Sequence, residues 1–290
     1  MMRPRFYELI RAELDANERL AVVTAEIGTT PIGPHPRHFN VGIREQLMIG
    51  VAAGLALEGY RPVAHSYAPF LVERPYEFLK LDLGHNDLGA VLVSTGASYD
   101  ASHEGRTHQA PGDVAALAAL PGWTVHVPGH VGEMEWLLRR ALATDDRVYL
   151  RLTEETNHAR VDGDGGLVVL RRGAEGAPLV LAVGPTLAPV LEATADLDVT
   201  VAYLTTVRPF PREELRAALG TGQEVVLVEP YLVGTSSAEV SAALEDRPHR
   251  LLALGVRNEE LRRYGTGLEH RAAHGLDAAG VRRSLGAFLG

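Results

Sequence analysis

The feature that most constrains the fold of this chain is a regular alternation of short β-rich runs with helical patterns. In the first half, helical patterns fall near residues 5–17, 43–58, 70–82, 112–120 and 130–143, and the strand-like runs are "LAVVTAEI", "RPVAHSYA", "GAVLVSTG", "WTVHVP" and "RVYLRLT". Such alternation is typical of βαβ units, in which each helix connects two parallel strands. The first half is therefore predicted to form a parallel-sheet α/β domain.

The same alternation restarts after "VDGDGGLVVLRRGAEGAP", a segment rich in Gly and charge that is typical of a linker. Beyond it, "PLVLAVG", "DVTVAYLT", "EVVLVEP" and "RLLALG" alternate with helical patterns near 187–196, 212–219 and 235–245. A chain of 290 residues is long enough for two domains. We predict two tandem parallel-sheet α/β domains, residues 1–155 and 178–290, joined by a linker at 156–177.

Composition excludes several classes of function. Cys is absent, which removes disulfides, thiolate metal sites and a Cys nucleophile. The net charge is −9 and the Lys and Arg residues are scattered, so no stretch could neutralise a nucleic acid backbone. The N-terminus has no signal-peptide core, and no apolar run approaches the roughly 18 residues that span a bilayer. We expect a cytoplasmic protein that binds neither nucleic acid nor membrane and has no metal ligands of its own.

One helical segment combines a carboxylate with many small residues. Glu45 stands at the start of "EQLMIGVAAGLAL", where its charge would interact favourably with the helix dipole by about 0.3–1 kcal/mol. Gly50 and Gly54 each cost about 1 kcal/mol of helix propensity relative to Ala, but they let two backbones approach closely. Two explanations stay open for the small residues: a tight contact with the sheet of the same domain, or a helix at a subunit interface.

Seven stretches follow one another in an order that matches a known family. In the first half they are "RHFNVGIREQLMIGVAAGLALEG", "SYAPFLVERPYEF", "HEGRTHQAPGDVAAL" and "VYLRLTEE", and in the second half "TVRPFP", "VVLVEPYLVGTSSAEV" and "LALGV". Together they resemble the pyrimidine-binding and C-terminal domains of transketolase and its relatives, which use thiamine diphosphate. The resemblance covers nearly the whole chain and implies the C-terminal half of a transketolase-like enzyme.

The resemblance implies a role for four residues around the cofactor. Glu45 matches the glutamate that binds the aminopyrimidine ring nitrogen and favours the tautomer that deprotonates the thiazolium carbon. Tyr67 and Phe70 match aromatic residues whose rings stack on the aminopyrimidine, a geometry that adds about 0.5–1.5 kcal/mol beyond area burial. Arg74 matches an arginine of many family members, which either contacts the cofactor or braces the pocket through an ion pair.

The resemblance also implies a set of substrate-binding residues. His108 matches the active-site histidine that hydrogen-bonds the donor, and an unperturbed pKa near 6.5 suits a histidine to proton transfer. Glu104 stands where transketolases have an aspartate that contacts sugar hydroxyls, and His103 precedes it. Arg151, in the closing strand, is a further candidate for substrate binding.

Two positions depart from the family pattern. Family members place a His or Arg where this chain has Gly96, and an Arg where it has Glu154, and both cations bind the substrate phosphate. Charge-assisted contacts are the strong ones in phosphate recognition. We therefore hypothesise that the substrate is not an ordinary sugar phosphate, or that its phosphate is held elsewhere.

The sequence lacks the motif that binds the diphosphate of the cofactor in this family. Family members hold the cofactor diphosphate through Mg²⁺ with a Gly-Asp-Gly motif and an Asn some thirty residues later. Here "GDGG" at 163–166 has no such Asn and lacks the strand-then-helix context of a phosphate site. The resemblance thus implies a separate N-terminal-half subunit that carries this motif and Mg²⁺, as in split transketolases, and an α₂β₂ heterotetramer.

The leading hypothesis is the β-type subunit of a split, thiamine diphosphate-dependent transketolase that transfers a two-carbon ketol unit to or from a small-molecule substrate. One alternative is a 2-oxo acid dehydrogenase β subunit, although Thr107, His108 and Gln109 favour transketolase. The other is a non-catalytic scaffold for the diphosphate-binding subunit. A scaffold would need none of Glu45, Tyr67, Phe70 and His108.

Overall fold

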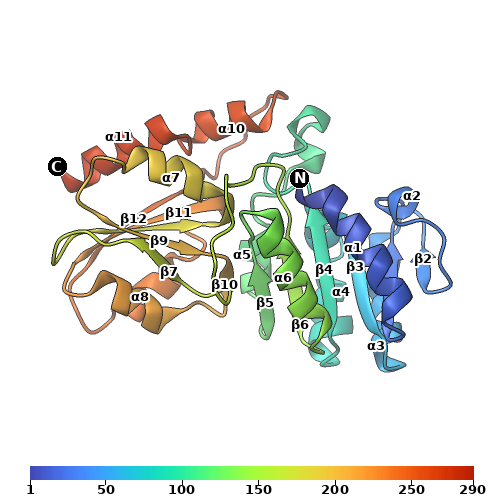
Figure 1. Cartoon of the computed structure of the whole chain (residues 1–290). Coiled ribbons are helices and arrows are strands. Elements are labelled where there is room, and N and C mark those ends of the chain that lie inside the picture. The colour runs from blue at the N-terminus through green and yellow to red at the C-terminus, as the bar shows by residue number, and fades with distance from the viewer.

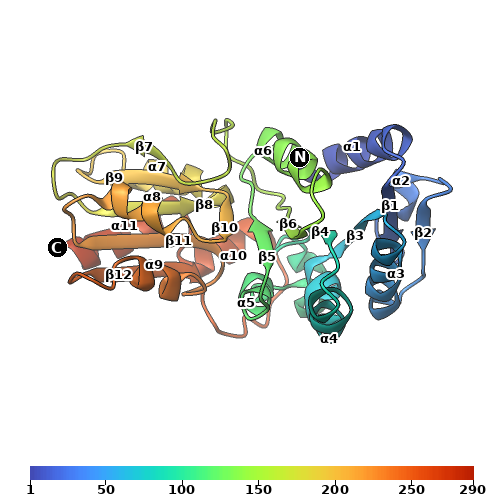
Figure 2. The ribbon, with the colours of Figure 1, turned by 90° about the horizontal axis from the view of Figure 1, so that it is seen from below.

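The computed structural model describes residues 1–290 and contains two α/β units side by side (Figure 1). Each unit is built on one sheet of mostly parallel strands with helices on both faces (Figure 2). The predicted fold class, two tandem parallel-sheet α/β domains, is confirmed. No helix in the structure is long and apolar enough to span a bilayer.

The first unit contains the elements up to residue 151. Its sheet has the strand order β10-β5-β6-β4-β3-β1-β2, in which β10 (Thr206–Arg208) comes from the second half of the chain and is the one antiparallel strand. In chain order the elements are α1 (Met2–Ala16), β1 (Leu20–Thr24), α2 (Thr29–Ile32), β2 (His38–Asn40), α3 (Glu45–Leu57), β3 (Arg61–Tyr67), the π-helical turn η1 (Pro69–Glu73), α4 (Tyr76–Phe78), the π-helical segment η2 (Leu79–His85), β4 (Ala90–Thr95), the 3₁₀ turns η3 (Ser102–Glu104) and η4 (Arg106–His108), α5 (Asp113–Ala118), β5 (Trp123–His126), α6 (Val131–Leu142) and β6 (Arg147–Arg151).

The second unit has a sheet of order β12-β11-β8-β9-β7, in which only β7 is antiparallel. The remaining elements are β7 (Val168–Arg171), β8 (Leu179–Val183), the 3₁₀ turn η5 (Gly184–Thr186), α7 (Leu187–Ala193), β9 (Thr200–Leu204), β10 (Thr206–Arg208), α8 (Arg212–Leu219), β11 (Glu224–Leu232), α9 (Ser237–Ala243), β12 (Arg250–Val256), α10 (Gly267–His274) and α11 (Ala278–Leu289).

Two short edge strands change the arrangement expected at the boundary between the domains. The segment expected to be a linker, 156–177, contains β7, which pairs with β9 at the edge of the second sheet. In return, β10 leaves the second unit and pairs with β5 at the edge of the first sheet. Each sheet therefore has an antiparallel strand at one edge, and the irregular part of the connection between β6 and β7 is residues 152–167.

Apolar side chains on each sheet alternate between its two faces, and each face forms part of a buried core. In the first sheet α1 and α6 cover one face, while α3, η1, η2 and α5 cover the other (Figure 2). In the second sheet α7 and α11 cover one face, and α8 and α9 the other. The largest core contains 35 buried residues and runs from the face beneath α3 to the face beneath α8. Because this core is continuous, burial of apolar surface holds the two units together as well as each unit by itself.

The carboxyl ends of the parallel strands bring the functional segments together. β3, β4 and β6 are neighbours in the first sheet, so the connections that follow Tyr67, Thr95 and Arg151 leave from the same edge. Because ligand sites in open α/β sheets lie outside the carboxyl ends of the strands, this edge is the expected place for a site.

Candidate functional site

Glu45 is the first residue of α3 and its side chain is almost wholly buried, with 2% exposed. Arg74, which directly follows η1, donates from Nη1 to Glu45 Oε2 at 2.7 Å. The other carboxylate oxygen, Oε1, accepts no hydrogen bond from the chain. Glu45 thus has one oxygen fixed by a cation and the other left for a further partner.

Arg74 also connects Glu45 to an aromatic side chain. Its Cζ lies 4.1 Å from the centroid of the Phe70 ring, a cation–π distance. The ion pair between Arg74 and Glu45 is one of the two roles that the sequence left open for this arginine. A direct contact of Arg74 with a cofactor stays a prediction.

Three of the predicted residues form one cluster, although they come from separate segments. Tyr67 ends β3, Phe70 lies in η1 and His108 ends η4. Their ring centroids lie 4.9 Å (Phe70–His108), 5.3 Å (Tyr67–His108) and 6.1 Å (Tyr67–Phe70) apart, all in edge-to-face orientations. This group, Tyr67, Phe70 and His108, is called the aromatic cluster below. Through Arg74 it is linked to Glu45.

Gly96 explains how the Tyr67 ring fits against the neighbouring strand. Gly96 directly follows β4 and has φ +65°, and a Cβ atom there would lie 2.7 Å from Tyr67 Cε1 and closer still to Cδ1. Real Cβ atoms do not approach a ring so closely, and a non-Gly residue would also be strained at this φ. The ring of Tyr67 therefore occupies the space that the Cβ of a His or Arg side chain at position 96 would need.

His103 and Glu104 lie in η3, on the same connection as His108. Both are exposed, and His103 Nε2 lies 3.6 Å from Glu104 Oε1. No hydrogen bond joins either residue to the aromatic cluster. Their predicted contact with substrate stays a prediction.

Arg151 is the last residue of β6 and takes part in a buried ion pair. Its side chain is fully buried, with Nε donating to Asp113 Oδ2 at 2.7 Å and Nη2 donating to Ser98 Oγ at 2.6 Å. Asp113 also accepts from the Tyr149 hydroxyl at 2.7 Å. The buried ion pair uses the charge of Arg151 inside the protein. The predicted contact of Arg151 with substrate stays a prediction.

Arg3 was missed by sequence reasoning and contacts the aromatic cluster. In α1, its Nε donates to the Tyr7 hydroxyl at 2.8 Å and its Nη1 to the Tyr67 hydroxyl at 3.3 Å. Its Cζ lies 5.3 Å from the Tyr67 ring centroid. No carboxylate pairs with Arg3, which is only partly exposed. The first residues of α1 thus supply the site with a cation whose charge is not neutralised within the chain.

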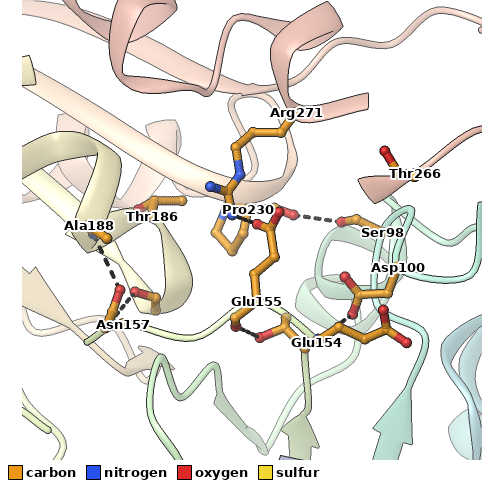
Figure 3. Close-up of polar contacts among 12 residues, drawn as sticks. Ser98, Asp100, Glu154, Glu155, Asn157, Thr186, Ala188, Pro230, Thr266 and Arg271 are labelled. Carbon is orange, nitrogen blue, oxygen red and sulfur yellow. Dashed lines mark hydrogen bonds and ion pairs between the residues drawn. The ribbon is translucent and has the colours of Figure 1, made fainter. Parts of the chain in front are cut away.

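Asp100 is a second residue that the sequence did not reveal. It lies between the ends of β4 and β6, where its Oδ2 accepts from the Glu154 backbone N–H at 3.0 Å. Burial raises the pKa of Asp100 to about 7, while the Glu154 N–H and the charge of Arg151 act in the opposite direction. The exposed Glu154 side chain lies beside it (Figure 3). Asp100 and Glu154 thus bring two carboxyl groups together beyond the carboxyl ends of β4 and β6.

The Gly-Asp-Gly stretch forms a turn. Asp164 Oδ1 accepts from the Gly166 N–H at 3.1 Å, Gly165 has φ +88°, and the strand that follows is β7. A turn that leads into an edge strand lacks the row of free N–H groups at a helix start that binds phosphates. The interpretation of 163–166 as a turn agrees with this geometry.

Comparison with known proteins now places the chain. Residues 5–158, which form the first unit and carry the aromatic cluster, match the family model described as transketolase, pyrimidine binding domain. The chain belongs to the transketolase family. The match covers more than half of the chain, and its limits enclose every predicted site residue.

Two relatives of this transketolase-family chain are similar over almost their whole length. An uncharacterized 33.6 kDa protein in the fasciation locus of Rhodococcoides fascians is 50% identical over 96% of this chain and 91% of its own. An apulose-4-phosphate transketolase subunit of Actinobacillus succinogenes is 29% identical over 97% of this chain and 94% of its own.

A solved structure described as a split gene transketolase, inactive β4 tetramer, superposes with a TM-score of 0.84 at 25% identity, over 99% of this chain and 97% of that one. By contrast, the chain spans about half the length of the 1-deoxy-D-xylulose-5-phosphate synthases that it matches. It therefore corresponds to the C-terminal half of a full-length transketolase-like protein.

Proposed function

We propose that this chain is the pyrimidine-binding subunit of a two-chain, thiamine diphosphate-dependent enzyme that transfers a two-carbon ketol unit. The observation that carries the proposal is the meeting of Glu45, Arg74 and the aromatic cluster at one edge of the first sheet. When bound, thiamine diphosphate supplies a nucleophilic carbon and an electron sink for the carbon–carbon bond that breaks.

The residues present fit the pyrimidine half of this cofactor. Glu45 Oε1 has no partner in the chain and can bind the ring nitrogen, while Arg74 keeps the carboxylate in place. Tyr67 and Phe70 offer aromatic surface to a flat heterocycle. His108 contacts both rings and can exchange a proton with a substrate hydroxyl or carbonyl.

A separate subunit is needed for the diphosphate and Mg²⁺, and α3 is the surface proposed to contact a neighbouring subunit. Its exposed apolar side chains include Ile43, just before the helix, and Leu57 at its end, which are 73% and 69% exposed. A Cβ at Gly54 would meet nothing within 4 Å, and one at Gly50 would meet only Asp82 at 3.6 Å. Because packing within the chain does not require these glycines, the interface explanation for them is favoured, as part of an α₂β₂ assembly.

We further propose that the substrate is not an ordinary sugar phosphate. Gly96 leaves no room for a cation and Glu154 is an acid, so the candidate cation for a negatively charged group at the site is Arg3. Its guanidinium keeps donors beyond those used by Tyr7 and Tyr67. A single arginine would bind one small anionic group more weakly than the paired cations of the family pattern.

Reconstitution tests the central proposal. The chain is co-expressed with a companion chain that carries the Gly-Asp-Gly…Asn motif, and two-carbon transfer is measured with and without thiamine diphosphate and Mg²⁺. The proposal predicts cofactor-dependent transfer by the complex and none by either chain alone. A complex that assembles and binds the cofactor but transfers nothing from a broad panel of ketose donors would support the scaffold alternative instead.

Arg3→Gln tests the substrate proposal in the active complex. KM should rise by about tenfold or more for donors with an anionic group and stay within twofold for neutral donors, because only the former would use the guanidinium. Arg5→Gln, in the same helix as Arg3, removes two ion pairs, one with Glu8 of α1 and one with Glu135 of α6, and is the matched control. Ordinary turnover of xylulose 5-phosphate by the wild-type complex would contradict the proposal.

A further inference from the structure

The connection that carries Glu104 and His108, residues 97–111, is held at both ends by the second unit. Near its start, Ser98 Oγ donates to the Pro230 carbonyl at 2.6 Å (Figure 3). At its end, the Leu232 N–H donates to the Pro111 carbonyl at 2.7 Å. Both partners lie in β11, so the two ends of this connection, called the His108 loop below, rest on one strand of the other domain.

The middle of the His108 loop contacts the irregular segment between β12 and α10. Ser102 Oγ donates to the Gly265 carbonyl at 2.7 Å, and Arg106 Nε donates to Glu260 Oε2 at 3.1 Å. Residues 257–266 have no regular secondary structure, and they pass over the two 3₁₀ turns of the loop. These two contacts flank Glu104 in sequence, one on each side.

Ring stacking adds a third kind of contact. The Tyr99 ring is stacked on His270 and on His274 of α10, with centroids 5.4 and 5.6 Å away and interplanar angles of 21° and 13°. Gly105 lies so close to Tyr264 that a Cβ on it would be 2.9 Å from the tyrosine ring. Stacking of this kind fixes the orientation of the loop as well as its position.

The immediate surroundings of His108 do little to fix its ring. Its only side-chain hydrogen bond is to Thr107, its neighbour in sequence, and its other contacts are the ring edges of Tyr67 and Phe70. The position of His108 therefore depends on the backbone of the His108 loop, and that backbone is held by the second unit.

We infer that residues 257–274 of the second domain act as a clamp that positions the His108 loop for the reaction, with Ser102 and Arg106 as positioning residues. The inference rests on the proposed function, and it gives the C-terminal domain a part in catalysis beyond holding subunits together. Since a misplacement of about 1 Å can cost roughly 100-fold in rate, loosening this loop should lower kcat before it lowers stability.

The double variant Ser102→Ala/Arg106→Gln tests the clamp in the reconstituted complex. It removes both polar contacts to residues 260 and 265 and also the bond from Arg106 Nη1 to the Gln109 carbonyl within the loop. Ser102→Ala/Glu260→Ala removes the same two contacts and keeps that bond, so it should lower kcat to a similar extent. The matched control is Ser284→Ala/Arg212→Gln, which makes the same chemical changes on α11 and on the α8–α9 ion pair. We expect kcat to fall at least tenfold in the test variant only, with the Kd of thiamine diphosphate within twofold of wild type. A kcat within twofold of the control would overturn the inference.

Two further experiments complete the test: an exchange of the two charges between positions 106 and 260, and hydrogen exchange, which does not depend on enzyme activity. Arg106→Glu and Glu260→Arg should each lower kcat by about threefold or more, and the combined variant should recover it to within twofold; failure to recover overturns the clamp. Hydrogen exchange of residues 101–110 should be faster in the Ser102→Ala/Arg106→Gln chain than in its control, and equal rates would also overturn it. If the wild-type complex shows no transfer at all, the proposed function fails, and hydrogen exchange still decides the clamp.

Discussion

Glu45 in the first domain and Glu229 in the second are both almost wholly buried, and the surroundings of the two residues differ. Glu45 has an arginine on one oxygen and lies beside the aromatic cluster. Glu229, within β11, is fully buried with no cation bonded to it, and the Ser236 N–H donates to its Oε2 at 3.5 Å. Burial raises the pKa of Glu229 to about 7, with hydrogen bonding to Ser236 acting in the opposite direction.

The difference shows that burial of a carboxylate does not by itself make a functional site. The groups next to Glu229 are Tyr231 and Ser236, which are buried with it in the interior of the second domain. Glu45 keeps a free oxygen next to side chains that can bind a ligand. Perturbed carboxylates are candidates for function only when such groups converge on them.

The largest expected effect is that of Glu45→Gln on the activity of the reconstituted complex. Activity should fall at least about 100-fold, because an amide cannot share a proton with a ring nitrogen as a carboxyl group does. Glu229→Gln should stay within about threefold of wild type, and so should Glu58→Gln at the far end of α3. Equal losses at Glu45 and Glu229 would remove the distinction between the two domains.

Gly96→Ala and Gly184→Ala compare the two sheets at glycines that directly follow a strand. Both have positive φ, and an added Cβ would meet the Tyr67 ring in the first case and the Val127 backbone in the second. We expect each variant to lose about 2–3 kcal/mol of unfolding free energy in denaturant titrations. Only Gly96→Ala should also weaken cofactor binding, since only Gly96 contacts the aromatic cluster. A cofactor Kd that changes equally in both would argue against the proposed site.

The pH dependence of stability should report on Glu229. Its pKa is higher in the folded chain than the usual 4.5, so the folded state binds more protons than the unfolded state between about pH 4.5 and 7. Stability from this group is present below that range and lost as pH rises through it. Glu229→Gln should therefore gain on the order of 1–2 kcal/mol relative to wild type between pH 5 and pH 8. A pH-independent difference would show that Glu229 is not the titrating group.

The smallest effect is expected at glycines on helix surfaces. Gly54→Ala in α3 and Gly286→Ala in α11 should each stabilise the isolated chain by about 0.5–1 kcal/mol, because a Cβ meets nothing within 4 Å at either position. Only Gly54→Ala should weaken assembly with the partner subunit, as measured by sedimentation. Unchanged assembly would mean that α3 is not the interface.

Sequence patterns predicted long elements and missed short ones. The helix predicted at 212–219 agrees with α8, because Pro211 precedes it and Gly220, at φ +58°, ends it. The edge strands β7 and β10 were not predicted, since three or four residues carry no periodicity and their pairing is set by the neighbouring unit. The interpretation of 156–177 as a linker was incomplete for this reason.

The residues of the candidate site were predictable where they belong to a family motif. They were less predictable where contacts between distant segments determine the positions of their side chains. Tyr67, Phe70 and His108 were expected together and do cluster. The ion pair of Arg151 was not predicted, because the sequence does not reveal that Asp113 lies beside it in the core. Arg3 was missed because its contact with Tyr67 spans 64 positions, and the N-terminal charges gave no local signal beyond an exposed helix start.

The most direct test of the proposed site is a crystal structure of the assembled pair with thiamine diphosphate and Mg²⁺ bound. We expect the pyrimidine ring to lie against Tyr67 and Phe70, with a ring nitrogen within hydrogen-bonding distance of Glu45 and the diphosphate held by the companion chain. A pyrimidine ring bound away from residue 45, or a diphosphate held by this chain, would contradict the proposal.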